Sequence, residues 1–108
     1  MNDIKALRTL LAKVEAGERP WRETCDNKAL GWYETDMCLK AFSGSLDAAK
    51  ALHEAVLPGW VWATSVSGVV MHVHHPTKRA LDQNGRSEIP ARAWLIAIIK
   101  ALIAKEAE

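Results

Sequence analysis

Hydrophobic side chains recur at helical spacing in two stretches of the chain. Between Asn2 and Gly17 they recur every three or four residues, and charged side chains occupy the positions between them. From Ser45 to Gly59 they recur in the same way, behind a serine that can accept a hydrogen bond from a free amide of the first turn. We expect a helix in each stretch, ended by Gly17 in the first and by Pro58 in the second.

A third stretch, "PARAWLIAIIKALIA", is apolar almost throughout. Proline suits the first turn of a helix, so we expect a helix from about Pro90 to Lys105. Its large apolar side chains spread over roughly 200° of the circumference, about twice the stripe that a surface helix needs. The run is shorter than the ~20 residues that cross a bilayer core, and Lys100 interrupts it, so we expect no membrane association.

Two β-prone runs, "WVWATSV" and "VVMHVHH", flank Ser67-Gly68, a pair suited to a tight turn. They predict an antiparallel hairpin from Trp60 to His75. Counting outward from the turn gives one largely apolar face and one smaller, more polar face. The predicted pairs are Val66 with Val69, Thr64 with Met71, Trp62 with Val73 and Trp60 with His75 on the apolar face, and Ser65 with Val70, Ala63 with His72 and Val61 with His74 on the other.

The remaining segments have weaker patterns. "RETCDNKALGW" supports a short helical turn ended by Gly31, and the mixed periodicity after it allows a short strand at Leu39–Phe42. The segment from Thr77 to Glu88 predicts a polar loop, mobile or in contact with a partner, with an Asn84-Gly85 turn. The 108 residues suit a single domain, residues 1–108, with an α+β fold in which helices pack on an antiparallel sheet containing the hairpin.

Composition narrows the range of functions. With 49% hydrophobic and 25% charged residues the chain is an ordinary globular protein. A formal net charge of +1 gives no basic field toward phosphate backbones, so we do not expect nucleic-acid binding. The first residues lack the pattern of a secretion signal, which favours a cytoplasmic protein. Cys25 and Cys38 lack CxxC spacing and are expected to be reduced thiols.

The run "HVHH", His72 to His75, is the main candidate for chemistry. His72 and His74 project from the same strand face, as two ligands of a zinc site can. A third ligand would have to be His53, His75, a thiol or a carboxylate, yet His75 points to the other face and no carboxylate adjoins the run. We therefore expect ordinary polar residues on the less buried sheet face, with a metal site at His72 and His74 as the alternative.

Catalytic groups are harder to find. Cys25 or Cys38 with His53 is a conceivable pair of nucleophile and base, but we expect a small buried thiol and an exposed helix histidine instead. The chain has no phosphate-binding loop, and its carboxylates are scattered over expected helix surfaces and loops. We expect a protein that is not an enzyme and that needs no cofactor.

Tryptophan is frequent, with five in the chain. Trp60 and Trp62 share a strand face, and no Lys or Arg lies between Lys50 and Lys78, so packing in a core or interface is expected rather than stacking on nucleic-acid bases. Because one hairpin face cannot cover the final helix, we expect a homodimer. Its expected interface residues are Trp60, Trp62, Trp94, Ile96, Ile99 and Ile103.

Four motifs, in this order, resemble the phage ABA sandwich domain family of bacteriophages and prophages. They are "CDNKALGW" (25–32), "AFSGSLDAAKAL" (41–52), "LPGWVW" (57–62) and "PARAWLIAIIKAL" (90–102). The resemblance covers roughly residues 3 to 105 and implies an α/β/α layered sandwich, but the family's activity is not established and no catalytic residue comes with it. Together with the missing catalytic groups, it favours a phage or prophage accessory protein that contacts an unknown phage or host protein.

Overall fold

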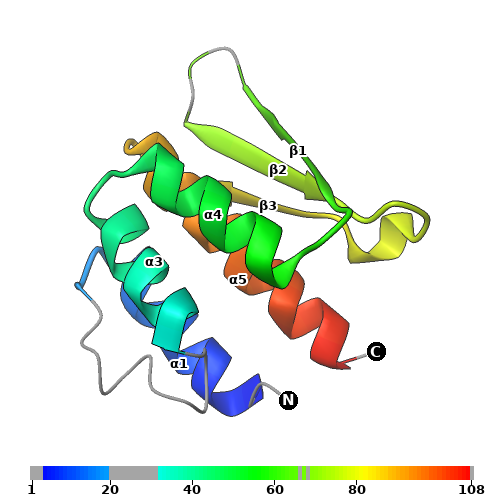
Figure 1. Cartoon of the computed structure of the whole chain (residues 1–108), viewed down its shortest axis with the longest axis horizontal. Helices are drawn as coiled ribbons and strands as arrows, with labels where there is room; N and C mark the ends of the chain where they lie inside the picture. Colours follow the sequence, from blue (N-terminus) through cyan, green and yellow to red (C-terminus); the bar gives the residue numbers. More distant parts are fainter. Residues whose placement is uncertain (1–3, 20–31, 66, 68, 108) are drawn as a thin grey trace.

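The computed structural model of the chain describes residues 4–19, 32–65, 67 and 69–107. Four described helices lie beside a three-stranded antiparallel sheet (Figure 1). The elements are α1 (Ile4–Glu15), α3 (Trp32–Phe42), α4 (Leu46–Val56), β1 (Val61–Thr64), β2 (Val70–His74), the 3-10 helix η1 (Arg79–Leu81), β3 (Gln83–Arg86) and α5 (Pro90–Ala107).

The two helices predicted from periodicity are confirmed as α1 and α4, and the helix predicted from the apolar run after Pro90 is confirmed as α5. Gly17 has the positive φ of 77° that ends α1. The Ser45 hydroxyl accepts a hydrogen bond from the Ala48 amide at 3.0 Å and so caps the start of α4. Both local signals come from residues next to the helix that they delimit, so neither depends on a tertiary contact.

The register of the predicted hairpin is also confirmed. In the strands, β1 pairs with β2 as Val61 with His74, Trp62 with Val73, Ala63 with His72 and Thr64 with Met71. Beyond the strands, the Ser65 amide donates to the Val70 carbonyl at 2.9 Å. Val66 and Gly68 of the predicted turn lie outside the described residues, as do Cys25 and the helical turn predicted to end at Gly31.

The prediction of a polar loop with an Asn84-Gly85 turn is wrong, because Gln83–Arg86 forms β3 and pairs with β2. Gly85 is needed for close approach rather than for a turn. A Cβ atom built on it would lie 2.2 Å from the Ala93 carbonyl oxygen and 2.6 Å from the Ala97 nitrogen, both backbone atoms of α5. The helix therefore rests directly on the backbone of β3.

The strand predicted at Leu39–Phe42 is wrong as well, because these residues end α3. Cys38, Ala41 and Phe42 are buried, and their spacing is that of one helix face. Arg92 of α5 covers the end of this helix. Its Nε and Nη2 donate to the Phe42 carbonyl at 3.2 and 2.9 Å, and its guanidinium lies 3.8 Å from the centroid of the Phe42 ring.

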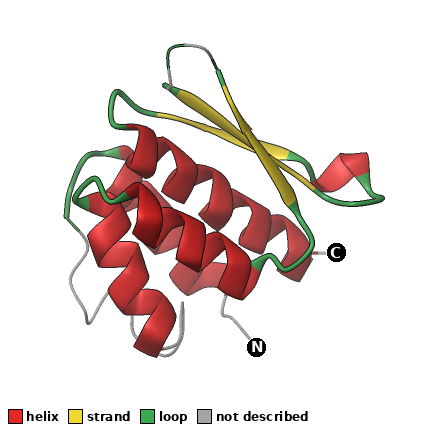
Figure 2. Ribbon diagram, turned by 45° about the horizontal axis from the view of Figure 1, so that its top comes forward, coloured by secondary structure: helices red, strands yellow, loops and turns green. Residues whose placement is uncertain are grey.

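Helix α5 is the centre of the molecule. It contacts β2 and β3 as well as α1, α3 and α4, and Figure 2 shows the described helices on one side of the sheet. The α+β class, with helices packed on an antiparallel sheet, is confirmed. The layer order differs from the α/β/α sandwich that the family resemblance implies, because the described helices leave the other sheet face bare.

The reason given for a homodimer is wrong, because one chain covers α5. Trp94, Ile96 and Ile99 are buried within the single chain, and so is Trp60, so these four residues of the predicted interface offer a partner almost no surface. Ile103 is partly buried. Trp62 remains 38% exposed. The prediction missed α3 and β3, the two elements that help to surround the helix.

Candidate functional site

His53 is buried, with 1% of its surface exposed, and the description of it as an exposed helix histidine is wrong. The Trp94 indole N–H donates to His53 Nδ1 at 3.3 Å. An indole nitrogen can only donate, so Nδ1 must be an acceptor and the proton of the neutral ring is on Nε2. Nε2 then donates to the Trp60 carbonyl at 3.0 Å. Burial lowers the pKa of His53 below its ordinary value of 6.5.

This hydrogen-bonded histidine joins α4 to α5 and to the start of β1. The Trp62 ring packs against it edge-on, with centroids 5.1 Å apart, and lies 5.2 Å from the Trp94 ring. Trp62 thus forms the solvent-facing side of an aromatic cluster beside a hollow of about 330 Å³. Because both His53 nitrogens are engaged, neither is left to accept a thiol proton from Cys38, and a Cys38–His53 pair of nucleophile and base is not formed. Cys25 lies outside the described residues.

His72 and His74 lie on the outer face of β2, the face that the described helices leave bare, as the alternation of the strand predicted. Their imidazole rings are nearly parallel, with centroids 6.1 Å apart and an angle of 10° between the ring planes. The His74 side chain is 45% exposed. The two side chains are therefore neighbours in contact with solvent.

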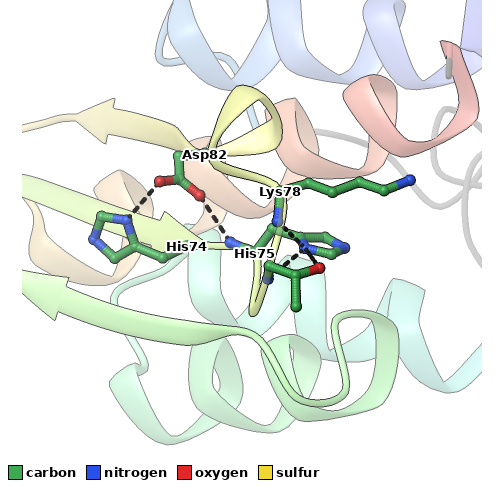
Figure 3. Close-up of polar contacts among 5 residues, drawn as sticks. His74, His75, Lys78 and Asp82 are labelled. Atoms are coloured by element: carbon green, nitrogen blue, oxygen red, sulfur yellow. Dashed lines mark hydrogen bonds and ion pairs between the residues drawn. The ribbon is translucent and has the colours of Figure 1, made fainter.

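Asp82 is the residue that sequence reasoning missed at this site. Its Oδ2 lies 3.2 Å from His74 Nδ1, and its Oδ1 accepts a hydrogen bond from the His75 amide at 2.8 Å (Figure 3). The hydrogen bonds from His74 and His75 hold the pKa of Asp82 below its ordinary value of 3.8. The statement that no carboxylate adjoins the histidine run is correct for the sequence and wrong for the structure, because β3 brings Asp82 back to the end of β2.

His75 has a different task from its neighbours. Its Nδ1 accepts hydrogen bonds from the Thr77 and Lys78 amides at 3.0 and 2.8 Å (Figure 3). Its ring meets the Trp60 ring edge-on at 5.0 Å, on the other side of the sheet from His72. His75 thus organises the connection between β2 and β3, and its Nδ1 is not available to a metal ion or a substrate proton.

Within residues 4–19, 32–65, 67 and 69–107, no three His, Cys, Asp or Glu side chains come together as ligands for a metal ion. A hollow of about 440 Å³ lies beside the Asp82 network and is lined by His74, His75, Pro76, Thr77, Arg79 and Asp82. Most of the polar groups that line this hollow already form the hydrogen bonds of Asp82 and His75 described above.

Comparisons with family models, with curated proteins and with solved structures find no match. Membership in the phage ABA sandwich domain family therefore stays a prediction from the four sequence motifs. The function is therefore inferred from two surfaces of the molecule, the outer face of β2 and the free edge of β1.

The second candidate surface is the free edge of β1, which lies at one side of the sheet (Figure 1). All four of its residues are exposed, and Val61 is the most exposed large apolar residue in the described part of the chain, at 58%. Pairing in an antiparallel ladder alternates, and the Ser65 to Val70 bond sets its phase. The peptide groups of Trp62 and Thr64 therefore point outward, away from β2.

Proposed function

We propose that this protein is a non-enzymatic accessory protein that acts through protein–protein contact, and that the partner binds along the free edge of β1. The observation that carries the proposal is an apolar, uncharged strand, Val61–Thr64, exposed along its whole length at the edge of the sheet. Native proteins usually protect such edges with charged residues, proline or a bulge, because unpaired peptide groups recruit further strands. This edge has none of those features.

The other edge of the sheet supports this assignment by contrast. β3 consists of polar residues and ends in the exposed Arg86. Such an edge does not favour pairing with a further strand. Of the two edges, only β1 combines exposed apolar side chains with outward-facing peptide groups.

A bound extended segment would gain energy from both parts of the edge. Its backbone would pair with the peptide groups of Trp62 and Thr64, in the mode by which extended peptides add to exposed sheet edges. Its side chains would cover Val61 on one face and Trp62 on the other, worth roughly 1 kcal/mol for each half-exposed side chain.

If the protein is a homodimer, the two copies contact each other through the free edge of β1 rather than through α5. A two-fold axis at Ala63 would pair Trp62 of one copy with Thr64 of the other and so satisfy every outward-facing peptide group of both strands. The two sheets would join into one, and both Trp62 side chains would stay on the helix side. A second copy of the chain is thus one occupant of the edge, and a phage or host protein is the other.

Two substitutions at Thr64 test the edge without disturbing β1 and β2. Because the Thr64 amide points outward, Thr64→Pro removes the backbone donor that a partner would use, together with the hydroxyl that donates to the Ser65 and Val70 carbonyls. Thr64→Val loses the same hydroxyl and keeps the amide, so the difference between the two variants reports the amide alone. Light scattering after size exclusion at about 10 µM should give the mass of two chains for the parent and Thr64→Val, and one chain for Thr64→Pro. A single-chain mass for the parent contradicts the homodimer.

A partner other than the chain itself needs a second experiment. A photo-activated cross-linking residue at Ala63, in cells of the bacterial host, should yield one defined adduct that Thr64→Pro abolishes. The same residue at Asn84, exposed on the opposite edge, should yield none. Adducts at both positions, or at neither, argue against contact through β1.

The biological setting is proposed from the four motifs. They favour a phage or prophage protein in the cytoplasm of the host, and the identity of the neighbouring genes tests this setting. Among the described residues, no helix is sufficiently long and apolar to cross a bilayer.

A further inference from the structure

The outer face of the sheet carries a pair of histidines that takes no part in the proposed contact at β1. His72 and His74 stand side by side on β2, with nearly parallel rings whose centroids are 6.1 Å apart. Within the described residues, the His72 imidazole has no hydrogen-bond partner, so its ring is free to turn toward His74. Both are half-buried on the outer face of their strand, and the His74 side chain is 45% exposed, so a hydrated ion has access.

Asp82 holds His74 in one orientation. Its carboxylate lies at Nδ1 of His74, and a carboxylate only accepts hydrogen bonds, so the Nδ1 proton is donated to Oδ2. In the neutral ring this leaves the lone pair on Nε2, directed away from the carboxylate. A histidine that donates one N–H to a carboxylate and offers its other nitrogen is the arrangement that most metal-binding histidines show.

We propose that His72 and His74 bind one divalent transition-metal ion of the Zn²⁺, Ni²⁺ or Cu²⁺ class, with Asp82 as the positioning residue of His74. Imidazole nitrogen suits these ions, and each Nε2 would lie about 2.0–2.1 Å from a zinc ion. Because the described residues offer no third ligand, water fills the remaining positions and the ion stays exchangeable. Binding requires the His72 ring to rotate, since parallel rings at 6.1 Å do not converge on one ion.

The competing explanation is that Asp82 serves only to hold the connection between β2 and β3. Its hydrogen bond from the His75 amide does have that effect. This explanation predicts that Asp82→Asn lowers stability and leaves metal affinity unchanged. The metal proposal predicts a loss of affinity in addition, because the partner that orients the ligand typically contributes 10- to 100-fold to affinity.

Calorimetric titration of the tag-free protein with Zn²⁺, Ni²⁺ and Cu²⁺ provides the test. One equivalent should bind, His72→Asn and His74→Asn should each weaken binding at least about 10-fold, and Asp82→Asn should weaken it by roughly 10-fold. Asn84→Ala is the matched control, since Asn84 pairs with His72 across the strands and has no ligand role. Thermal unfolding without metal shows whether each variant is folded.

Electron paramagnetic resonance of the Cu²⁺ form reads the ligands directly. The parent should show two coordinated imidazole nitrogens, and each single histidine variant should show one. Binding that survives the loss of either histidine, or Asp82→Asn affinity equal to that of the parent, overturns the proposal. Thr64→Pro should leave the metal affinity unchanged, so this test is independent of the proposed contact at β1.

Discussion

The two edge strands of the sheet have opposite sequences, and only the polar one contains a buried residue. β1, "VWAT", is the apolar strand and is exposed along its length, whereas β3, "QNGR", is polar and lies against the central helix. From hydrophobicity alone, one would expect the apolar β1 to pack against the central helix and the polar β3 to be the strand exposed along its length. The difference teaches that burial at β3 depends on backbone contact through Gly85, while β1 is anchored mainly at its start, where the Trp60 carbonyl accepts from His53.

The largest effect is expected from Gly85→Ala. The added Cβ would meet backbone atoms of α5, which cannot move aside like the end of a flexible side chain. We expect a loss of about 3 kcal/mol in the free energy of unfolding. Chemical denaturation measures it, with Gly17→Ala as the control. Gly17 has nothing within 4 Å and should lose only about 1 kcal/mol, from its positive φ. Equal losses would contradict direct packing of α5 on β3.

Trp94→Phe tests the anchor at the start of β1. It removes the donor to His53 Nδ1 and leaves a buried acceptor without a partner, which should cost about 2 kcal/mol. Hydrogen exchange should then quicken at the amides that pair β1 with β2, and much less at those that pair β2 with β3. Uniform quickening across the sheet would mean that β1 is not separately anchored.

Acidification should weaken the same anchor. Because the pKa of folded His53 lies below 6.5, the unfolded chain takes up a proton there before the folded chain does. The stability that this residue contributes is complete above pH 6.5 and is lost as the pH falls below it. His53→Gln keeps a donor and an acceptor but cannot be protonated, so its stability should fall less between pH 7 and pH 5. Parallel curves for the two proteins would contradict this prediction.

The smallest effect on stability is expected at the exposed edge itself. Val61→Lys changes a residue that is 58% exposed, so the free energy of unfolding of the monomer should shift by no more than about 0.5 kcal/mol. The same variant should prevent association through β1, because a charged lysine on an edge strand opposes pairing with a further strand. A loss of several kcal/mol at a concentration where the protein is monomeric would show that β1 is held more firmly than its exposure implies.

The sequence by itself determined the features that depend on neighbouring residues. Periodic apolar positions specified α1 and α4, and an apolar run behind Pro90 specified α5. Ser45 specified the start of α4, and alternation around Ser67-Gly68 specified the hairpin register and the shared face of His72 and His74. These signals are local, because the 3.6-residue period of a helix and the two-residue period of a strand are written into adjacent positions.

Only the tertiary structure decided the environments that depend on distant segments. The polar β3 forms because β2 supplies its hydrogen bonds and α5 packs on Gly85, and neither reason is visible in "QNGR". His53 is buried because Trp60 and Trp94 satisfy both of its nitrogens. Asp82 reaches His74 because the chain turns back after η1. Such contacts join residues far apart in sequence, and the local pattern of apolar and polar residues does not predict which of them come into contact.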